Sequence, residues 1–314
     1  MGRLEAGVWK SGWAKPGASG AFERSVTRFR EKSLVAERDR YHLYVSYACP
    51  WAHRTLVVRA LRGLEDAIGV TAVDPKMGDD GWAFSKDDPD VLFGAQFLRE
   101  IYLRAQPDFT GHVTVPVLWD KKRATIVNNE SRDIIRMFDT DLAPLAKNAT
   151  VEFVGAPENL RAKIDETLDA IYAPINNGVY RCGFATSQRA YDAACTELFA
   201  ALDHWNDVLG DQRFLCGDAM TEADVAMFTT LLRFDLVYYA HFKCNVRRIQ
   251  DYENLWGFLR DMFQRPAIRS TCRLDHIKTH YYWSQDNVNP TRIVPLGPTI
   301  PLDVPHDRAR FSAR

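Results

Sequence analysis

Strand-like sequence is confined to the first half of this 314-residue chain, and this asymmetry limits the folds that the chain can adopt. Runs of β-branched and aromatic residues, which are typical of strands, occur at 41–46, 68–73, 112–119 and 124–127. Apolar residues recur at helical spacing between and after these runs, so the predicted order is β-α-β-α-β-β-α, with helices at 57–64, 91–102 and 130–138. After Pro144 the strand signal disappears, and further helices are predicted at 157–175, 188–209, 223–239 and 254–264.

Two domains of different class follow from this order. A β-α-β-α-β-β-α arrangement is thioredoxin-like, and we predict such a domain at 40–143. The helices beyond it predict an all-helical second domain at 144–285. Residues 1–39 are rich in glycine and charge, so we expect an extension that wraps around a domain or stays mobile. The C-terminal tail comprises 286–314, and its Pro-rich stretch at 289–305 is expected to be irregular.

One cysteine stands at the boundary between the first strand and the first helix. In Tyr44-Val-Ser-Tyr-Ala-Cys-Pro-Trp-Ala-His-Arg54, the strand-like run ends before Cys49 and a helical pattern begins at Pro50. A thiol at a helix start faces unpaired backbone N–H groups and the positive end of the helix dipole, which favour the thiolate. Ala52 occupies the place of the second thiol of a Cys-x-x-Cys motif. A sulfur adduct on Cys49 therefore has to be released by an outside thiol such as glutathione. The alternative is a cysteine that only fills core volume.

The composition argues against several classes of protein. A net charge of −1 and a pI near 6.7 give no electrostatic basis for binding nucleic acid or an anionic membrane. No apolar run is long enough to span a membrane, and residues 1–10 lack the apolar stretch of a secretory signal. The cysteines form no Cys-x-x-Cys pair, which argues against a zinc site and against a disulfide framework. Their scattered positions therefore favour a reducing cytoplasm. The six cysteines are Cys49, Cys182, Cys195, Cys216, Cys244 and Cys272.

Six short motifs occur in order through both predicted domains. They are Ala48-Cys-Pro-Trp-Ala-His-Arg54, Gly81-Trp-Ala-Phe84, Val113-Thr-Val-Pro-Val-Leu-Trp-Asp120, Asn128-Asn-Glu-Ser131, Asn177-Gly-Val-Tyr-Arg-Cys-Gly-Phe-Ala185 and His280-Tyr-Tyr282. Together they resemble the glutathionyl-hydroquinone reductases, the Xi class of the glutathione transferases. The resemblance covers roughly residues 40–285 and implies a glutathione-binding thioredoxin-like domain, an all-helical substrate domain and a homodimer.

Two of these motifs are expected to bind glutathione through backbone and helix-end groups. The Val115–Pro116 bond resembles the cis-proline of thioredoxin-like folds, and the bend would expose the Val115 backbone to the cysteinyl segment of glutathione. The alternative is a plain proline at a strand start. Ser131 and the helix N–H groups around it can hold the γ-glutamyl carboxylate, and Glu130 can hold the ammonium group. The alternative for this pair is an ordinary N-terminal cap.

Two further positions are assigned to glutathione by resemblance. Trp82 resembles the family's glutathione-contacting tryptophan, although a buried loop anchor is nearly as consistent with the sequence. His112 stands where the family pattern leads us to expect arginine before Val-Thr-Val-Pro. This departure weakens the case for a cation that grips a glutathione carboxylate at that position.

The aromatic pocket is expected to be supplied mainly by tyrosines. By resemblance, Tyr180 is the proton donor or acceptor, and Tyr238 and Tyr281 assist the thiolate and quinol binding. Tyrosine is usually an amphipathic packing residue, and we favour that role for Tyr239 and Tyr282.

These expectations combine into a reductive deglutathionylation of aromatic thioethers. The Cys49 thiolate attacks the glutathionyl sulfur, the ring carbon receives a proton through Tyr180, and hydroquinone leaves. A second glutathione then releases glutathione disulfide, with no metal and no tightly bound cofactor. One alternative is another cysteine-type transferase, a thiol transferase or dehydroascorbate reductase. The other is a non-catalytic binding module, because a fold does not fix a function.

Overall fold

The structure is a computed structural model of the chain, and it describes residues 2–12, 19–148 and 158–311. Contacts divide the chain into two compact units that are built from alternating segments. The first unit comprises Met1–Lys15, Arg24–Ala149 and Arg273–Val294. The second comprises Pro16–Glu23, Thr150–Cys272 and Pro295–Arg314.

The first unit is built on a four-stranded sheet with the order β4-β3-β6-β7. Strand β3 (Tyr41–Val45) runs parallel to β4 (Ile68–Ala72) and antiparallel to β6 (Val117–Asp120), which pairs with β7 (Thr125–Asn128). Every residue of β3 and β6 is buried, as expected for the two central strands. The predicted thioredoxin-like fold is confirmed, although the predicted strand at 112–119 is interrupted after His112.

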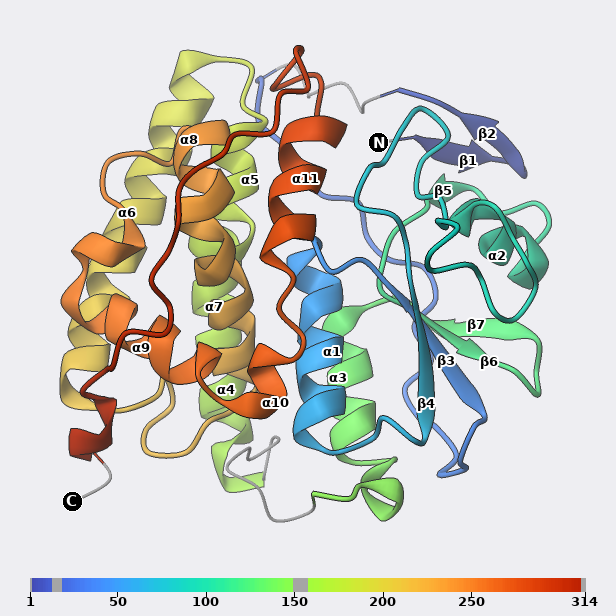
Figure 1. The fold of residues 1–314 in the computed structure, drawn as a ribbon, viewed down its shortest axis with the longest axis horizontal. Helices are drawn as coiled ribbons and strands as arrows, with labels where there is room; N and C mark the ends of the chain where they lie inside the picture. Colours follow the sequence, from blue (N-terminus) through green and yellow to red (C-terminus); the bar gives the residue numbers. More distant parts are fainter. Residues whose placement is uncertain (1, 13–18, 149–157, 312–314) are drawn as a thin grey trace. The chain divides into compact units, whose positions relative to one another are not determined.

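Helices pack against this sheet. Figure 1 shows α1 (Pro50–Leu61) and α3 (Ser131–Asp139) side by side, and the two helices are in contact. Helix α2 (Leu98–Ala105) contacts β7. The helix predicted at 91–102 begins only at Leu98, because the Asp90 carboxylate accepts the N–H groups of the loop residues Leu92, Phe93 and Ala95 and holds that segment in turns.

Part of the N-terminal extension forms a second, small sheet. Strands β1 (Arg3–Glu5) and β2 (Val8–Lys10) pair antiparallel, and β1 also pairs with β5 (Gly111–His112). Leu4 is fully buried on one face of this sheet. The sequence did not predict these strands, because runs of two or three residues are too short to show a period.

Helix α11 (Leu274–Ser284) belongs to the first unit, whereas the predicted boundaries place it in the helical domain. The His280 Nδ1 atom lies 3.0 Å from the Pro75 carbonyl oxygen, and Ser284 Oγ accepts the Met77 N–H at 2.9 Å. These polar contacts with the loop after β4 connect α11 to the first unit, and apolar periodicity alone does not reveal them.

The second unit is all-helical in the part that the structure describes, as predicted. Helix α7 (Glu222–Arg233) is buried along its whole length and begins with a capping box between Thr221 and Asp224. Two π-helical turns, Tyr172–Asn176 and Phe234–Tyr238, interrupt the predicted helices. The other helices are α4 (Glu158–Ile171), α5 (Gly178–Gly183), α6 (Gln188–Asp211), α8 (Tyr239–His241), α9 (Glu253–Phe263) and α10 (Pro266–Arg269). Residue 157, where the first was predicted to start, lies outside the described residues.

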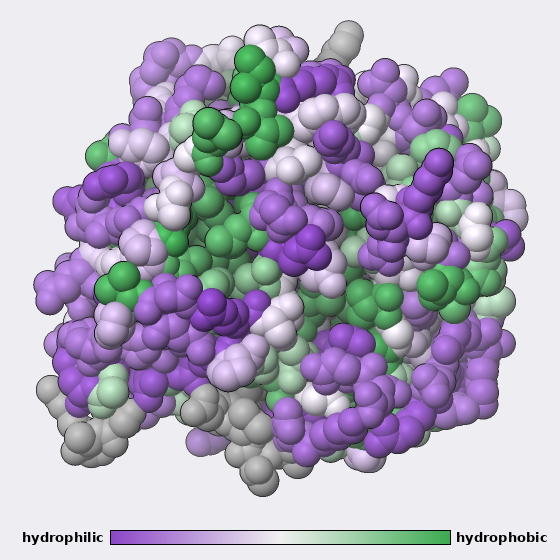
Figure 2. Space-filling view, in the orientation of Figure 1, coloured by the Kyte–Doolittle hydropathy of each residue, from purple (hydrophilic) through white to green (hydrophobic). Residues whose placement is uncertain are grey.

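The C-terminal tail is mostly irregular, as predicted, but it is anchored on the second unit. Arg308 is fully buried, and its guanidinium donates to the carbonyl oxygens of Leu209, Gln212 and Arg213 at 2.5–2.8 Å. These carbonyls belong to the C-terminal end of α6 and the residues that follow it. Hydrophilic residues cover most of the face drawn in Figure 2, and hydrophobic residues show in patches between them.

Candidate active site

Cys49 lies at the N-terminus of α1, as the sequence predicts. Its extended backbone (φ −78°, ψ 121°) makes it the N-cap, and Pro50 occupies the first helical position. The Cys49 carbonyl accepts the His53 N–H at 2.9 Å, which closes the first helical turn. The thiol is half-buried, with Sγ 3.7 Å from the Val115 carbonyl oxygen. The geometry therefore brings two of the predicted site residues together.

The segment that carries Val115 is held in place by Tyr102. The Val115–Pro116 peptide is cis, as the resemblance implies. The Tyr102 hydroxyl lies 2.8 Å from the Thr114 carbonyl oxygen and accepts the Thr114 N–H at 3.2 Å. Burial raises the pKa of Tyr102, so the phenol stays neutral and keeps its proton for hydrogen bonding.

The same hydroxyl also connects the second predicted glutathione segment. The Asn129 side-chain amide donates to the Tyr102 hydroxyl at 3.1 Å, and its carbonyl oxygen accepts the Phe29 N–H at 3.2 Å. Asn129 directly precedes Glu130, just as Thr114 directly precedes Val115. Tyr102 is therefore hydrogen-bonded to both predicted glutathione segments. In the sequence it is only the last residue of the helix predicted at 91–102.

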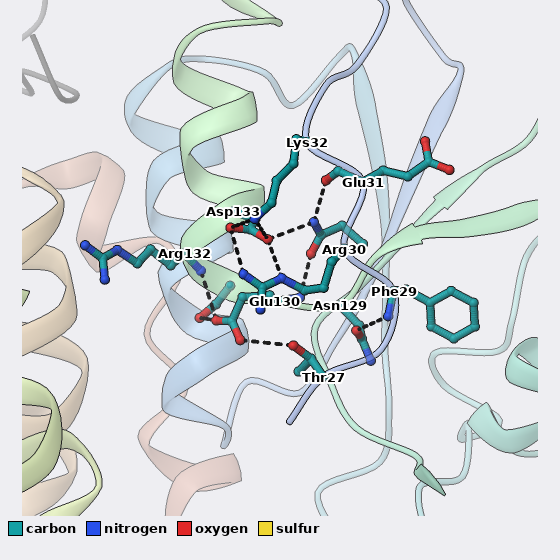
Figure 3. Close-up of polar contacts among 11 residues, drawn as sticks. Thr27, Phe29, Arg30, Glu31, Lys32, Asn129, Glu130, Arg132 and Asp133 are labelled. Carbon is teal, nitrogen blue, oxygen red and sulfur yellow. Dashed lines mark hydrogen bonds and ion pairs between the residues drawn. The ribbon is translucent and has the colours of Figure 1, made fainter. Parts of the chain in front are cut away.

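Glu130 and Ser131 lie at the start of α3 (Figure 3). The Glu130 side chain accepts the Arg132 N–H at 3.3 Å and the hydroxyls of Ser131 at 3.4 Å and Thr27 at 3.3 Å. Glu130 is thus the N-cap of the helix, and Ser131 is its buried first residue. Capping, the alternative weighed for this pair, is present in the structure. Capping keeps Glu130 and Ser131 near the helix end, where a glutathione carboxylate or ammonium group would bind.

The N-terminal extension borders this helix start, a contribution that the sequence did not reveal. Figure 3 shows residues 27–32 beside β7 and the first turn of α3. Arg30 and Lys32 both pair with Asp133, at 2.6 and 2.9 Å. Burial acts to raise the pKa of Asp133, but its hydrogen bonds to these two cations and to Asn128 outweigh burial and lower it. The carboxylate therefore stays charged and fixes the extension beside the start of α3.

Trp82 and His112 lie in the same unit. Trp82 is 6% exposed and stacks on His280, with ring centroids 4.7 Å apart. Its buried setting agrees with a loop anchor, which was the alternative for this residue. His112 is half-buried in β5, and its Nδ1 atom lies 3.4 Å from the Gly2 carbonyl oxygen. Tyr281, in α11, is 1% exposed.

In the second unit, Tyr180 and Tyr238 form a pair inside an aromatic cluster. Their hydroxyl oxygens are 3.5 Å apart, and their ring centroids are 5.9 Å apart. Phe242 stacks on Tyr238 at 5.4 Å and meets the edge of Tyr180 at 5.5 Å. Gly183 permits this packing, because a Cβ atom at that position would lie 2.2 Å from the Phe242 ring. The structure thus joins two of the three tyrosines assigned to the quinol.

The described residues contain no group of three His, Cys, Asp or Glu side chains that could hold a metal ion. Within the same residues, no helix combines the length and the apolar character that are needed to cross a bilayer.

Comparisons with known proteins decide the family. The models of the glutathione S-transferase N-terminal and C-terminal domains match residues 48–141 and 188–261. Glutathionyl-hydroquinone reductase YqjG of Escherichia coli is 48% identical over an alignment of 326 positions that covers 98% of each chain. A Xi-class transferase from Natrialba magadii superposes with a TM-score of 0.91 at 51% identity and covers 99% of this chain and 97% of its own. The chain belongs to the Xi-class glutathione transferases.

A glutathione-bound structure is known within this family. One example is that of YqjG from Escherichia coli K-12, with a TM-score of 0.87, 47% identity and coverage of 98% of this chain and 99% of the other. The resemblance read from the six motifs is therefore confirmed, and so is the thioredoxin-like plus helical fold of a Xi-class transferase. The roles of the individual site residues stay predictions.

Proposed function

We propose that this protein reduces glutathionyl-hydroquinones to hydroquinones with glutathione as co-substrate, through a Cys49–glutathione mixed disulfide. The observation that carries the proposal is the placement of Cys49 Sγ at a helix N-terminus, 3.7 Å from the Val115 carbonyl oxygen, in a Xi-class chain. Its support is the 48% identity to a glutathionyl-hydroquinone reductase over 98% of the chain.

The first half-reaction breaks the bond between sulfur and the aromatic ring. The Cys49 thiolate attacks the glutathionyl sulfur, a disulfide forms between Cys49 and glutathione, and the ring carbon receives a proton delivered by Tyr180. The hydroxyl of Tyr238, 3.5 Å from that of Tyr180, is suited to orient the phenolic proton, and Tyr281 is assigned to quinol binding. Hydroquinone leaves, and two electrons have passed from the thiol to the ring.

The second half-reaction restores the thiolate. A second glutathione attacks the mixed disulfide, and glutathione disulfide and the Cys49 thiolate are released. The net reaction converts one glutathionyl-hydroquinone and one glutathione into hydroquinone and glutathione disulfide. No further oxidant or reductant enters, so the cycle needs no tightly bound cofactor.

Glutathione is proposed to lie along the two segments that Tyr102 positions. The Val115 backbone would pair with its cysteinyl residue, next to Cys49, while Ser131 and Glu130 would bind the γ-glutamyl carboxylate and ammonium. Pro116 shapes the bend, and Trp82 and His112 border the remaining end. We further propose a homodimer in a reducing cytoplasm, because the family resemblance implies the dimer and the chain has no Cys-x-x-Cys pair.

Turnover of glutathionyl-menadiol, compared with chlorodinitrobenzene conjugation, tests the proposal. We expect glutathione-dependent release of menadiol, weak conjugation, and loss of release in Cys49→Ser, because an alkoxide cannot form the mixed disulfide. Intact-mass analysis of the wild-type protein should show one glutathionyl adduct after the first half-reaction. Efficient reduction of dehydroascorbate or of a mixed disulfide without menadiol release would favour the other cysteine-type transferases. No turnover of any of these substrates would favour a binding module.

A further inference from the structure

A row of basic residues crosses one face of the small N-terminal sheet. Strand β1 lies between β2 and β5, and its register places Arg3 opposite Lys10 on one side and opposite His112 on the other. Residues directly opposed across antiparallel strands project from the same face of a sheet. Leu4, which projects from the other face, is fully buried. The basic row therefore lies on the face directed away from that buried contact, and the Arg3 side chain is 58% exposed.

A pocket of about 600 Å³ in the first unit is lined by part of this row. Arg3 and His112 contribute to its wall, together with Thr114 and Asn129. Thr114 precedes Val115 and Asn129 precedes Glu130, so the pocket adjoins both segments to which glutathione is assigned, although none of Cys49, Val115, Glu130 and Ser131 lines it. Lys10, the third member of the row, is not among the lining residues.

The residues that line the pocket carry a net positive charge, and His112 does not contribute to it. Burial lowers the pKa of His112, and the nearby Arg3 guanidinium lowers it further, so this imidazole is neutral at pH 7. A guanidinium is protonated throughout the physiological range. Among the described lining residues, Arg3 and Arg28 are cationic and Glu5 is the one acid.

We infer that Arg3, presented by β1 beside His112, binds the glycyl carboxylate of glutathione. The inference rests on the proposed function, which assigns the sulfur to Cys49 and the γ-glutamyl end to Glu130 and Ser131. The glycyl carboxylate is then the one charged group of the tripeptide without a partner. The family pattern led us to expect arginine at position 112, but the neutral His112 cannot supply a cation there. Arg3, which lies opposite His112 in the sheet, can supply it.

To bind the glycyl carboxylate, Arg3 has to release the carboxylate of Glu5, its partner in the structure. Its guanidinium is hydrogen-bonded to Glu5, two residues along the same strand, and both side chains are substantially exposed. Exposed ion pairs of this kind contribute little free energy, so a ligand carboxylate can replace Glu5 at small expense. A guanidinium can also bind a carboxylate through two parallel N–H groups, which favours a fixed ligand.

Calorimetric titration of the full-length protein with two ligands tests this inference. The ligands are reduced glutathione and its glycyl ethyl ester, which lacks the carboxylate in question. Arg3→Gln should raise the Kd for glutathione by about three- to tenfold and leave the Kd for the ester within about twofold. Glu5→Gln should lower the Kd for glutathione, because the competing carboxylate is gone. Lys10→Gln, which alters the same row outside the pocket, should change neither Kd.

A second substitution provides a rescue. The double variant Arg3→Gln, His112→Arg should recover most of the lost glutathione affinity, because it returns a guanidinium to the neighbouring position in the sheet. Equal losses for glutathione and ester in Arg3→Gln, or no loss for either, would overturn the inference. A different result would contradict the proposed function: the wild-type protein would bind glutathione but would not release menadiol from glutathionyl-menadiol. In that case the Kd values for glutathione and for its glycyl ethyl ester still decide the role of Arg3.

Discussion

Tyr102 is a single buried residue whose hydroxyl is bonded to both proposed glutathione-binding segments. It accepts one N–H from Thr114 and one from the Asn129 amide, and it lies within donating distance of the Thr114 carbonyl. A phenol with a raised pKa can perform all three tasks as a neutral group. The residue was not recognisable as functional in the sequence, because a tyrosine on an apolar helix face is usually there for packing.

Tyr102→Phe should therefore weaken both folding and glutathione binding. The change leaves buried polar groups of Thr114 and Asn129 without a partner, and we expect the free energy of unfolding to fall by about 1–3 kcal/mol. Urea denaturation measures this loss, and calorimetry should show a higher Kd for glutathione. Tyr172→Phe, at an exposed tyrosine, is the matched control and should change neither quantity. An unaltered Kd in Tyr102→Phe would remove its positioning role.

The proposed role of Tyr180 is confined to the first half-reaction, whereas Cys49 takes part in both. If Tyr180 only manages the proton on the ring, Tyr180→Phe should slow hydroquinone release by about 10²–10⁴-fold in rapid mixing. Reduction of a preformed Cys49–glutathione disulfide should stay within a few-fold of wild type, because no ring carbon is protonated in that step. Equal losses in both steps would assign Tyr180 to the thiolate or to glutathione, and the proton donor would then be sought at Tyr238 or Tyr281.

At the scale of elements, the helix α5 and the π-helical turn Phe234–Tyr238 carry the paired tyrosines. Tyr180 lies inside α5, and Tyr238 is the last residue of the turn. Turns of this type occur often at functional sites, where the extra residue redirects a side chain. Sequence periodicity predicted one uninterrupted helix at 223–239, because a single extra residue per turn barely alters an apolar pattern.

Gly183→Ala should disturb this arrangement. The added methyl group would lie 2.2 Å from the Phe242 ring, which has to move, and Phe242 stacks on Tyr238. We expect a loss of stability of about 1–3 kcal/mol together with slower hydroquinone release. Thermal denaturation and rapid mixing measure the two effects. Gly210→Ala, in α6, meets only the flexible end of Asn254 at 3.2 Å and should be neutral or stabilising.

The sequence predicted elements well where they are long and apolar on a regular period. The strand predicted at 41–46 is Tyr41–Val45, and the helix predicted at 188–209 is Gln188–Asp211. It predicted the helix start after Cys49 and, by resemblance, the cis bond before Pro116, which the structure confirms. It could not predict β1, which is three residues long, nor the contribution of Thr27, because such contacts arise from tertiary pairing rather than from local pattern.

At the scale of the whole molecule, the C-terminal tail stabilises the helical unit through one buried cation. Burial lowers the pKa of Arg308 to about 10, which still leaves it charged at pH 7, and its guanidinium satisfies three backbone carbonyls. Arg308→Ala should lower the free energy of unfolding by about 2–4 kcal/mol, because these carbonyls lose a charged donor. Thermal denaturation measures the change. Arg310→Ala, two residues away and exposed, should stay within about 0.5 kcal/mol of wild type.

The chain enters each of the two units three times, and no unit is a continuous stretch of sequence. The first unit is complete only with Arg273–Val294, and the second only with Pro295–Arg314. During synthesis on a ribosome, therefore, the thioredoxin-like half cannot close around helix α11 until Arg273–Val294 has been made, which comes after Thr150–Cys272 of the helical half. Completion of the two halves is therefore interleaved along the nascent chain, because each half needs a segment that follows part of the other.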